Sequence, residues 1–366
     1  MLRILTYEQI DRKEWSRLVR ESKTGTWFQS PEAYDFFASQ PDLFEPFAVG
    51  VETSALRAVC VGYVTLDKNP LMQFFSRRAI ITGGPCLADD ATAEEVTMLM
   101  QSVGECVRCR VENHKHYTIN ITQKLSTPIY IETRNFNDYS PWKDAFAAAG
   151  FNYQPHLDIH IDTRSPEIVE NNLGESRKRD IRTTIREGVK IISIGDCKLE
   201  NGDCKLEIGN QVRERMVGEF YAILKKLYKT KVKTPLFPLS FFLALSKHPE
   251  GRFLLTEYNG HIIGGTVCVE QAGKCLYEWF ACGEDGVYPH IFPSCYATYA
   301  GICYAAEHEC PRFDMMGAGK PDKAYGVRDF KAKFGGKQVE YGRFLRVENP
   351  CLYSIGKLAV KILKSI

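Results

Sequence analysis

The sequence predicts two similar α/β domains, each built from a mixed sheet flanked by helices. Its 366 residues suit two domains of ordinary size better than one. Both halves show the same order of elements: a hairpin, a strand, a long helix, a strand, a short helix ending at glycine, and a final strand. This shared order with little sequence identity indicates duplication of one α/β unit. We expect the boundary within 150–165 and assign residues 1–155 and 156–366 to the two domains.

Hydrophobic periodicity predicts the elements of the first half. Strands are expected at 2–7, 46–51, 56–66, 79–83, 117–122 and 153–163, and helices at 93–113 and 141–149. The long helix places Val96, Met100, Val103 and Val107 on one face, which is typical of a helix packed on a sheet. The short helix ends at Gly150, a residue that adopts the left-handed backbone of a helix terminus.

The second half repeats this pattern. Helices are expected at 175–188, 210–229, 292–309 and 325–334, with a shorter one beginning at 238, and strands at 252–258, 261–270, 274–282, 313–316 and 338–347. Asn259-Gly260 between the first two of these strands is the strongest short hairpin signal in the chain. Gly317-Ala-Gly319 predicts a turn after the short strand, and Gly335-Gly336 ends the last helix.

Composition and charge argue against several classes of protein. A formal net charge of +2 is too small for a protein that coats nucleic acid by charge alone. No window reaches the ~18–20 apolar residues that a membrane span requires, and the N-terminus carries charges where a signal peptide would be apolar. The thirteen cysteines, an odd number without a secretion signal, are typical of reduced and mostly buried thiols. We therefore expect a cytoplasmic protein.

Histidine and cysteine patterns suggest metal sites only weakly. They are Cys106/Cys109, His114/His116, His156/His160, and the near-identical heptapeptides 195–201 and 202–208, each with one cysteine. None has the further ligands that a zinc or redox site needs. We therefore interpret the cysteine and histidine pairs as surface or core side chains, and the repeated heptapeptides as a duplicated loop in solvent. We expect no metal and no bound cofactor.

A basic helix is the first candidate for substrate binding. In 175–188, Arg179, Arg182 and Arg186 lie three or four residues apart on one side, and we expect Ile181 and Ile185 to turn away from them. Such a row suits a phosphate-bearing substrate, because guanidinium groups bind phosphate through two parallel hydrogen bonds. A solvated helix with an interdomain salt bridge explains the same pattern, so both interpretations stay open.

The glycine-rich segment 317–336 is the second candidate. It is not a phosphate-binding P-loop, because Asp314 stands where the first glycine is required and Pro321 replaces the serine or threonine. Its cations are Lys320, Lys323, Arg328, Lys331 and Lys333. A glycine turn with exposed N–H groups and clustered cations predicts an anion-binding site. The alternative interpretation of the same segment is an ordinary basic surface helix.

Segments along nearly the whole chain carry a family resemblance. They are WFQSP (27–31), GGP (83–85), RKRDIR and REGV (within 177–189), FDMMG (313–317), GVRDFK (326–331), FG (334–335) and VEYG (339–342). In this order they resemble the FemAB-type family. The resemblance implies two tandem domains of the GNAT acyltransferase fold. It also implies transfer of an amino acid from aminoacyl-tRNA onto the peptide stem of a peptidoglycan precursor.

The resemblance also implies site residues. Phe330-Lys331 matches the Phe-Lys pair of the family's active site, so Lys331 is the expected catalytic residue, stabilising negative charge while the substrate supplies the amine. The expected substrate-binding residues are Arg179, Arg182, Arg186, Lys233, Lys320, Tyr325, Arg328 and Phe330. The family's Thr-x-x-Arg is Thr230-Lys-Val-Lys233 here, which keeps the charge but loses the guanidinium fork. No segment sustains the heptads of the coiled-coil arm that some members carry.

The acyl donor and the C-terminus leave alternatives open. A CoA-dependent GNAT enzyme normally carries a glycine pair where the central strand meets the next helix. This chain instead has YPHIFPS at 288–294, and the first domain has acidic residues at the corresponding place. An aminoacyl-tRNA is therefore the expected donor, with acyl-CoA as the alternative. Residues 352–366 form an amphipathic pattern with Lys357, Lys361 and Lys364, which suits either packing on its own domain or lying on an anionic membrane.

These observations predict an aminoacyl or acyl transferase that acts on an amine of a cell-envelope precursor, in the cytoplasm or at the inner face of the membrane. One alternative is a CoA-dependent N-acetyltransferase for a small amine or amino sugar. The other alternative is a degenerate GNAT pair that serves as a non-catalytic binding module.

Overall fold

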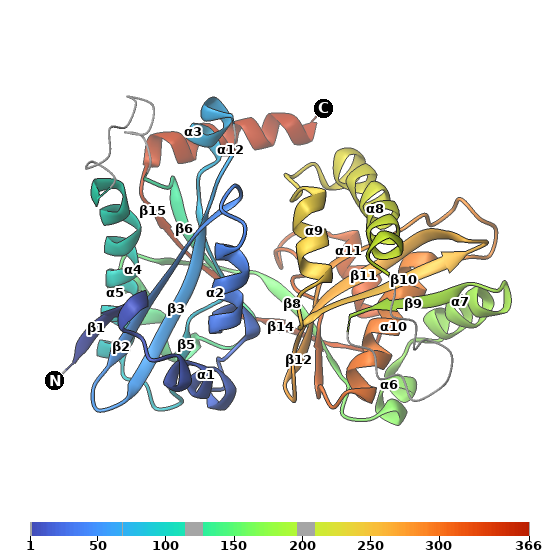
Figure 1. Cartoon of the computed structure of the whole chain (residues 1–366), viewed down its shortest axis with the longest axis horizontal. Helices are drawn as coiled ribbons and strands as arrows, with labels where there is room; N and C mark the ends of the chain where they lie inside the picture. Colours follow the sequence, from blue (N-terminus) through green and yellow to red (C-terminus); the bar gives the residue numbers. More distant parts are fainter. Residues whose placement is uncertain (1, 68, 114–126, 196–208, 366) are drawn as a thin grey trace. The chain divides into compact units, whose positions relative to one another are not determined.

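The computed structural model describes residues 2–67, 69–113, 127–195 and 209–365. Contacts group the chain into two compact units, one formed by Met1–His156 with Glu340–Ile366 and the other by Leu157–Val339. Each unit is a mixed sheet with helices on its faces, as the sequence predicts (Figure 1). The expected strand at 117–122, the pair His114/His116 and the cysteines of the repeated heptapeptides lie outside the described residues.

Among the described residues, the sheet of the first unit has eight strands. Its path is β1 (Arg3–Thr6), β2 (Phe44–Glu52), β3 (Leu56–Thr65), β4 (Ala79–Gly83), β6 (Tyr130–Asn135), β15 (Arg343–Val347) and β7 (Asn152–Gln154), and β5 (Cys86–Leu87) pairs with β3. The pairing of β4 with β6 is parallel, and the other pairings are antiparallel.

Helices cover both faces of this sheet (Figure 1). The helices of the first unit are α1 (Arg12–Glu21), α2 (Pro31–Ala38), α3 (Pro70–Ser76), α4 (Ala93–Asn113), α5 (Lys143–Ala148) and α12 (Pro350–Ser365), with 3-10 turns at Tyr7–Gln9, Trp27–Gln29 and Ser140–Trp142. The predicted apolar face of α4 is buried against one face of β2 and β3. Trp15, Leu18 and Val19 of α1 pack on the opposite face. Alternate residues of each strand therefore belong to different cores.

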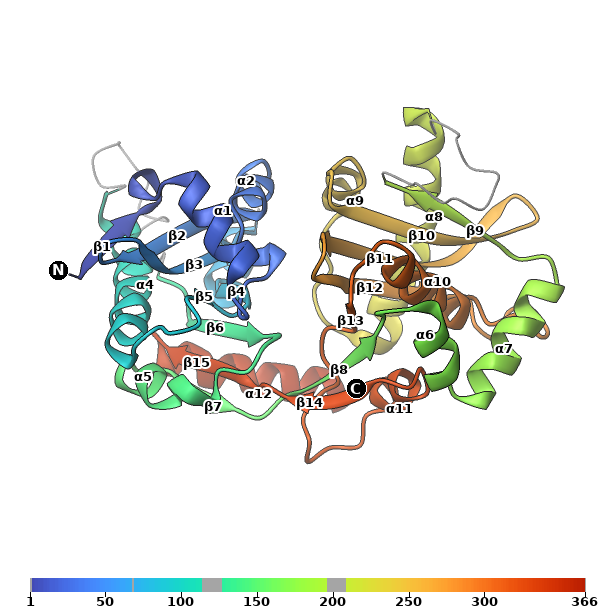
Figure 2. The same ribbon diagram turned by 90° about the horizontal axis from the view of Figure 1, so that it is seen from below.

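The C-terminal strand β15 belongs to the first unit. It lies between β6 and β7 (Figure 2). Phe344 is opposite both Thr133 and Tyr153. The ring of Phe344 also stacks on that of Phe146, with 3.9 Å between the centroids. The single strand expected at 338–347 is therefore two strands, β14 (Lys337–Glu340) and β15, separated at Gly342, which has a φ of 66°. By these contacts Glu340–Ile366 groups with the first unit, whereas the sequence analysis assigned it to the second domain.

In the part of the second unit that the structure describes, the sheet has seven strands. Its order is β14, β8 (Leu157–Asp162), β13 (Arg312–Asp314), β12 (Cys275–Gly283), β11 (His261–Gln271), β10 (Gly251–Tyr258) and β9 (Lys190–Ile194). Strands β12 and β13 are parallel. The predicted strand 153–163 is two strands, β7 and β8, one in each unit. Asn259 and Gly260 both have positive φ, as the predicted two-residue hairpin between β10 and β11 requires.

The helices of the second unit also cover both faces of its sheet. They are α6 (Pro166–Asn172), α7 (Glu175–Arg186), α8 (Asn210–Leu227), α9 (Leu239–Ser246), α10 (Pro293–Glu307) and α11 (Gly326–Ala332), with a π-helical turn at Tyr228–Val232. Helix α10 packs with α6 and α7 on one face, where Leu254 and Leu276 are buried. Phe220 of α8 packs on the other face, against Phe253. Within the described parts of the chain, no helix is long and apolar enough to cross a membrane.

Candidate functional site

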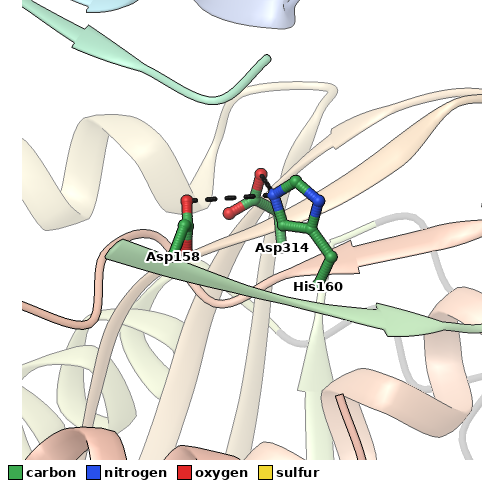
Figure 3. A group of neighbouring side chains, drawn as sticks. All are labelled: Asp158, His160 and Asp314. Atoms are coloured by element: carbon green, nitrogen blue, oxygen red, sulfur yellow. Dashed lines mark ion pairs between the residues drawn. The ribbon is translucent and has the colours of Figure 1, made fainter. Parts of the chain in front are cut away.

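Strands β8 and β13 bring three ionisable side chains together in the second unit. Asp158 and His160 are two residues apart on β8 and so project from the same face, and Asp314 of β13 is directly opposite His160 (Figure 3). His160 Nε2 lies 3.2 Å from Asp314 Oδ2 and 3.9 Å from Asp158 Oδ2. Asp158 is only 3% exposed and Asp314 is fully buried, so this is an interior charge cluster.

The two carboxyl groups of this cluster differ in their acidity. Burial and the nearby charge of Asp314 raise the pKa of Asp158 to about 7, although His160 and Lys331 act in the opposite direction. Burial disfavours the charged form of Asp314 as well, but the charge and hydrogen bond of His160 outweigh it and lower the pKa of this carboxyl. Asp158 is therefore the carboxyl of this pair that gains a proton first as the pH falls.

A β-bulge follows β13 at this cluster. Met315 N donates to Ile159 O (3.1 Å) and Ala318 N donates to Leu157 O (2.7 Å). The chain therefore advances three residues from Met315 to Ala318 while β8 advances two, from Ile159 to Leu157, which is the pattern of a bulge. The extra length is taken up at Met316 and Gly317, which have φ values of 51° and 96°. The predicted glycine turn is thus a left-handed bulge, a conformation that Gly317 adopts without strain and Met316 does not.

The two aspartates hold the backbone of this bulge. Asp158 Oδ1 accepts a hydrogen bond from Gly317 N at 2.8 Å, and Asp314 Oδ1 accepts one from Met316 N at 2.9 Å. Two consecutive N–H groups are therefore directed at carboxylates. The carbonyl groups of Met315 and Gly317 accept hydrogen bonds from a different side chain.

Lys331 of α11 is the partner of these carbonyl groups. Its ammonium donates to Met315 O and, at 2.8 Å, to Gly317 O. Its charge also lowers the pKa values of Asp158 and of the buried Glu278, although burial leaves both above their ordinary values. Lys333, two residues further along and another cation of the glycine-rich segment, is exposed at the end of α11. Lys331, and not Lys333, is thus directed into the charged interior of the unit.

Arg177 fixes the residue next to Lys331, and the sequence analysis did not select it. Its guanidinium lies 4.3 Å from the centre of the Phe330 ring and donates to Phe330 O at 3.3 Å. Asp180, one turn along α7, forms an ion pair with Arg177 at 3.4 Å. The signal in the sequence was the spacing of Arg177, Asp180 and Ile181, which share the buried face of α7.

The predicted arginine row lies on the outer side of α7. Arg179, Arg182 and Arg186 are exposed, with Arg179 3.3 Å from Asp180 and Arg182 3.5 Å from Glu170. Ile181 is buried as expected. Ile185 is not buried with it and is 48% exposed. The row is a solvent-facing cationic surface in the described structure.

The other expected substrate-binding residues take different positions. Arg328 donates to Ala318 O and Lys323 O, each at 2.9 Å, and to Lys320 O, so its guanidinium braces the glycine-rich loop from inside. A Cβ on Gly319 would lie 2.8 Å from the ring of Tyr325, which shows that this ring covers the loop. Lys320 is exposed in this loop, and Lys233 is exposed after the π-helical turn with a φ of 54°.

The cluster of Asp158, His160 and Asp314 has the donor atoms of a metal site. One ligand atom from each residue lies within 4.8 Å of the others. The charge of Lys331, however, already acts on Asp158, and the Asp158 and Asp314 carboxylates are engaged by the bulge N–H groups. We therefore interpret the cluster as the acidic counterpart of the Lys331 ammonium.

The two mixed sheets with their flanking helices define a tandem GNAT-like fold, which is the fold of a class of acyltransferases. Among solved structures, FemX matches with a TM-score of 0.65 at 12% identity, over 96% of this chain and 99% of FemX. The C-terminal domain of a putative lysylphosphatidylglycerol synthetase from Agrobacterium fabrum matches at 0.55 and 13% identity, over 96% of each chain. A tandem GNAT protein of the clavulanic acid biosynthesis pathway matches at 0.54 and 11% identity, over 96% of this chain and 99% of that protein.

No family model matches the sequence, and the search of curated proteins found no match. The likeness to FemX spans nearly the full length of both chains. The resemblance to the FemAB-type family is therefore confirmed at the level of the fold.

Proposed function

We propose that this protein is an acyltransferase that moves an aminoacyl or acyl group onto an amine, with Lys331 as its catalytic residue. The observation that carries the proposal is the Lys331 ammonium, held by the carbonyl groups of Met315 and Gly317 at a glycine-rich bulge. An ammonium has three N–H donors, and these two bonds use two of them. The third remains for an oxygen of the substrate.

The reaction needs such a donor. When the amine attacks the carbonyl carbon of an ester, a C–N bond forms and negative charge develops on the carbonyl oxygen. The C–O bond to the leaving group then breaks, and the proton lost by the amine goes to the leaving oxygen. A fixed donor aimed at the developing charge contributes about 3–4 kcal/mol. Lys331 is positioned by its neighbours before the substrate arrives, so it need not reorganise during the reaction.

The donor we propose is an aminoacyl-tRNA and not acyl-CoA. In GNAT enzymes the pyrophosphate of CoA binds where the central strand meets the next helix, which here is the start of α10. Phe292 N already donates to Thr184 Oγ1 (3.0 Å) and Ser294 N to Asp285 Oδ1 (3.3 Å). A Cβ on Gly283 would lie 2.4 Å from Ser294 N, so the strand end is packed against this helix terminus. The site therefore offers a carboxylate where a pyrophosphate would need free N–H groups.

The acceptor we propose is an amine of a cell-envelope precursor. Support comes from the FemAB-type motifs in the sequence and from the fold that the chain shares with FemX. Arg179, Arg182 and Arg186, with Lys233 and Lys320, offer exposed cations for the phosphates of such a substrate or of a charged tRNA.

We also propose that α12 contacts the inner face of the membrane. Ile355 and Leu358 are 53% and 60% exposed, and Phe75 of the neighbouring α3 is 45% exposed. The helix contains Lys357, Lys361 and Lys364 but no acidic residue. Apolar side chains among lysines suit an anionic lipid surface, where each basic residue contributes about 1 kcal/mol.

The decisive experiment is a donor screen on the purified protein, using a set of charged tRNAs and a set of acyl-CoAs with diamine and peptidoglycan-precursor acceptors. We expect turnover with a charged tRNA, and acetyl-CoA should give no saturable heat in calorimetry. Stoichiometric micromolar binding of acetyl-CoA would replace our donor with the N-acetyltransferase alternative. Binding of an acceptor without turnover by any donor would favour the non-catalytic binding module.

A further inference from the structure

We infer that Asp158 is a positioning residue for Lys331, acting through the peptide backbone of Gly317. The inference rests on the proposed function for its catalytic consequence but on geometry alone for the positioning itself. Gly317 is held at both ends: its N–H donates to Asp158 at 2.8 Å and its carbonyl accepts from Lys331 at 2.8 Å. One residue thus connects a buried carboxyl group on β8 with the ammonium on α11.

The strand pairing on either side makes this connection stiff. Met315 N and Ala318 N both donate to carbonyl groups of β8, at 3.1 and 2.7 Å, so only Met316 and Gly317 lie free of the ladder. Met316 holds a left-handed backbone, which is strained for a residue with a side chain. The bond from Met316 N to Asp314 and the bond from Gly317 N to Asp158 offset this strain. Without the hydrogen bond to Asp158, the Gly317 peptide would be held less firmly in the orientation that directs its carbonyl group at Lys331.

The charges around Asp158 are mixed: those of His160 and Lys331 favour its carboxylate, whereas that of Asp314 opposes it. His160 faces it from the same strand, Asp314 from β13 and Lys331 from α11. Glu278 of β12 also feels the charge of Lys331. A carboxylate at position 158 attracts the ammonium as well as the Gly317 N–H, so both interactions favour one placement of Lys331.

Two variants separate the hydrogen bond from the charge. Asp158→Asn keeps an oxygen that can accept from Gly317 N and removes the negative charge, whereas Asp158→Ala removes both. Asp162→Asn is the matched control, because it lies on the same face of β8 but pairs with Arg164 near the surface. Thermal unfolding of each variant establishes that it is folded before any further measurement.

The first readout does not depend on enzymatic activity. Competitive labelling of the folded protein with acetic anhydride, followed by peptide mass spectrometry, measures the reactivity of Lys331 against pH. We expect Asp158→Ala to increase labelling of Lys331 severalfold, Asp158→Asn to have a smaller effect, and Asp162→Asn to have none. Unchanged labelling in a folded Asp158→Ala protein would overturn the inference. If this variant does not fold, unchanged labelling and kinetics in Asp158→Asn would overturn it.

The second readout uses the donor found in the screen. We expect kcat of Asp158→Ala to fall about 10²-fold with KM nearly unchanged, because a displacement of about 1 Å costs that much. Partial recovery in Asp158→Asn supports positioning, whereas equal losses in kcat from Asp162→Asn would mean general damage to the unit and contradict it. If no donor supports turnover in the wild type but labelling changes as expected, the proposed function fails and the positioning of Lys331 stands.

Discussion

Arg177 lies with its guanidinium 4.3 Å from the ring centre of Phe330 and donates to the backbone carbonyl of the same residue. A second aromatic ring, that of Phe334, is 5.1 Å from the guanidinium. Because Lys331 follows Phe330 in α11, an arginine of α7 fixes the backbone from which the candidate catalytic lysine extends. The basic segment at 175–188 therefore has two roles on two faces: a buried structural face and an exposed cationic face.

The first prediction concerns Lys331. Lys331→Ala should lower kcat by about 10²–10³-fold with KM little changed, because the stabilisation of developing charge is lost. Its melting temperature should also fall, because the variant loses the hydrogen bonds to Met315 O and Gly317 O. Lys331→Arg should recover only part of this rate, since a planar guanidinium does not fit the carbonyl groups of Met315 and Gly317 as an ammonium does. Steady-state kinetics of these variants beside Lys333→Ala is the test. Full turnover in Lys331→Ala with loss in Lys333→Ala would refute the catalytic assignment.

The second prediction concerns Arg177. Arg177→Ala removes the buried ion-pair partner of Asp180, which then keeps its contact with the exposed Arg179, and should reduce the free energy of unfolding by about 3 kcal/mol. Arg177→Lys should recover less than half, because a lysine cannot both stack on Phe330 and donate to its carbonyl. Urea denaturation measures both. The control is Arg186→Ala, which removes an exposed arginine of the same helix and should change stability by no more than about 0.5 kcal/mol.

The third prediction concerns the exposed arginine row. Replacing Arg179, Arg182 and Arg186 together with glutamine should raise KM for the phosphate-bearing substrate about tenfold or more and leave kcat nearly constant, because uniform binding is lost. The dependence of KM on salt should also weaken, since fewer phosphate contacts remain. A triple glutamine variant at Arg12, Arg17 and Arg20, exposed arginines of α1, controls for the change in net charge. Equal effects of the two triple variants would refute a specific role for the row.

The fourth prediction concerns α12 and membranes. In flotation assays the protein should bind vesicles that contain phosphatidylglycerol and not vesicles of phosphatidylcholine alone. Changing Ile355 and Leu358 to aspartate should abolish binding, because both the apolar contact and the favourable charge are lost. Val212→Asp, at an exposed apolar residue of α8, should bind as the wild type does. Undiminished binding by the double variant would contradict the proposed membrane contact.

The fifth prediction concerns the pH dependence of stability. Burial opposes ionisation of Glu132, but the charges of Arg134 and Arg343 outweigh it and lower its pKa from 4.5 to about 2. The folded chain therefore binds fewer protons than the unfolded chain between these values. The stabilisation by this carboxylate is complete above pH about 4.5 and is lost as the pH falls toward 2. Glu132→Gln should be destabilised by about 3 kcal/mol near neutral pH, and its deficit relative to the wild type should shrink in acid denaturation curves.

Local patterns in the sequence determined the elements and the fold class. The apolar face of α4, the Asn259-Gly260 hairpin and the glycine turn at Gly317 were all predicted, because periodicity and turn chemistry depend on residues close together in the chain. The FemAB-type motifs likewise predicted the tandem GNAT fold that the structure shows. They also selected Lys331, which the structure directs at Gly317.

Only the tertiary structure decided which strands pair with one another and which charged side chains are brought together. The alternation around Asp158 and His160 predicted a strand, but only pairing with β13 placed Asp314 opposite His160. Helical spacing places Arg177 and Arg179 on different faces of α7, but it does not show which face is buried, because burial of a charged side chain depends on distant groups that solvate it. The position of β15 in the first sheet depends likewise on long-range pairing with β6 and β7. The sequence by itself therefore determined what each segment forms, and the long-range packing decided which charges it brings together.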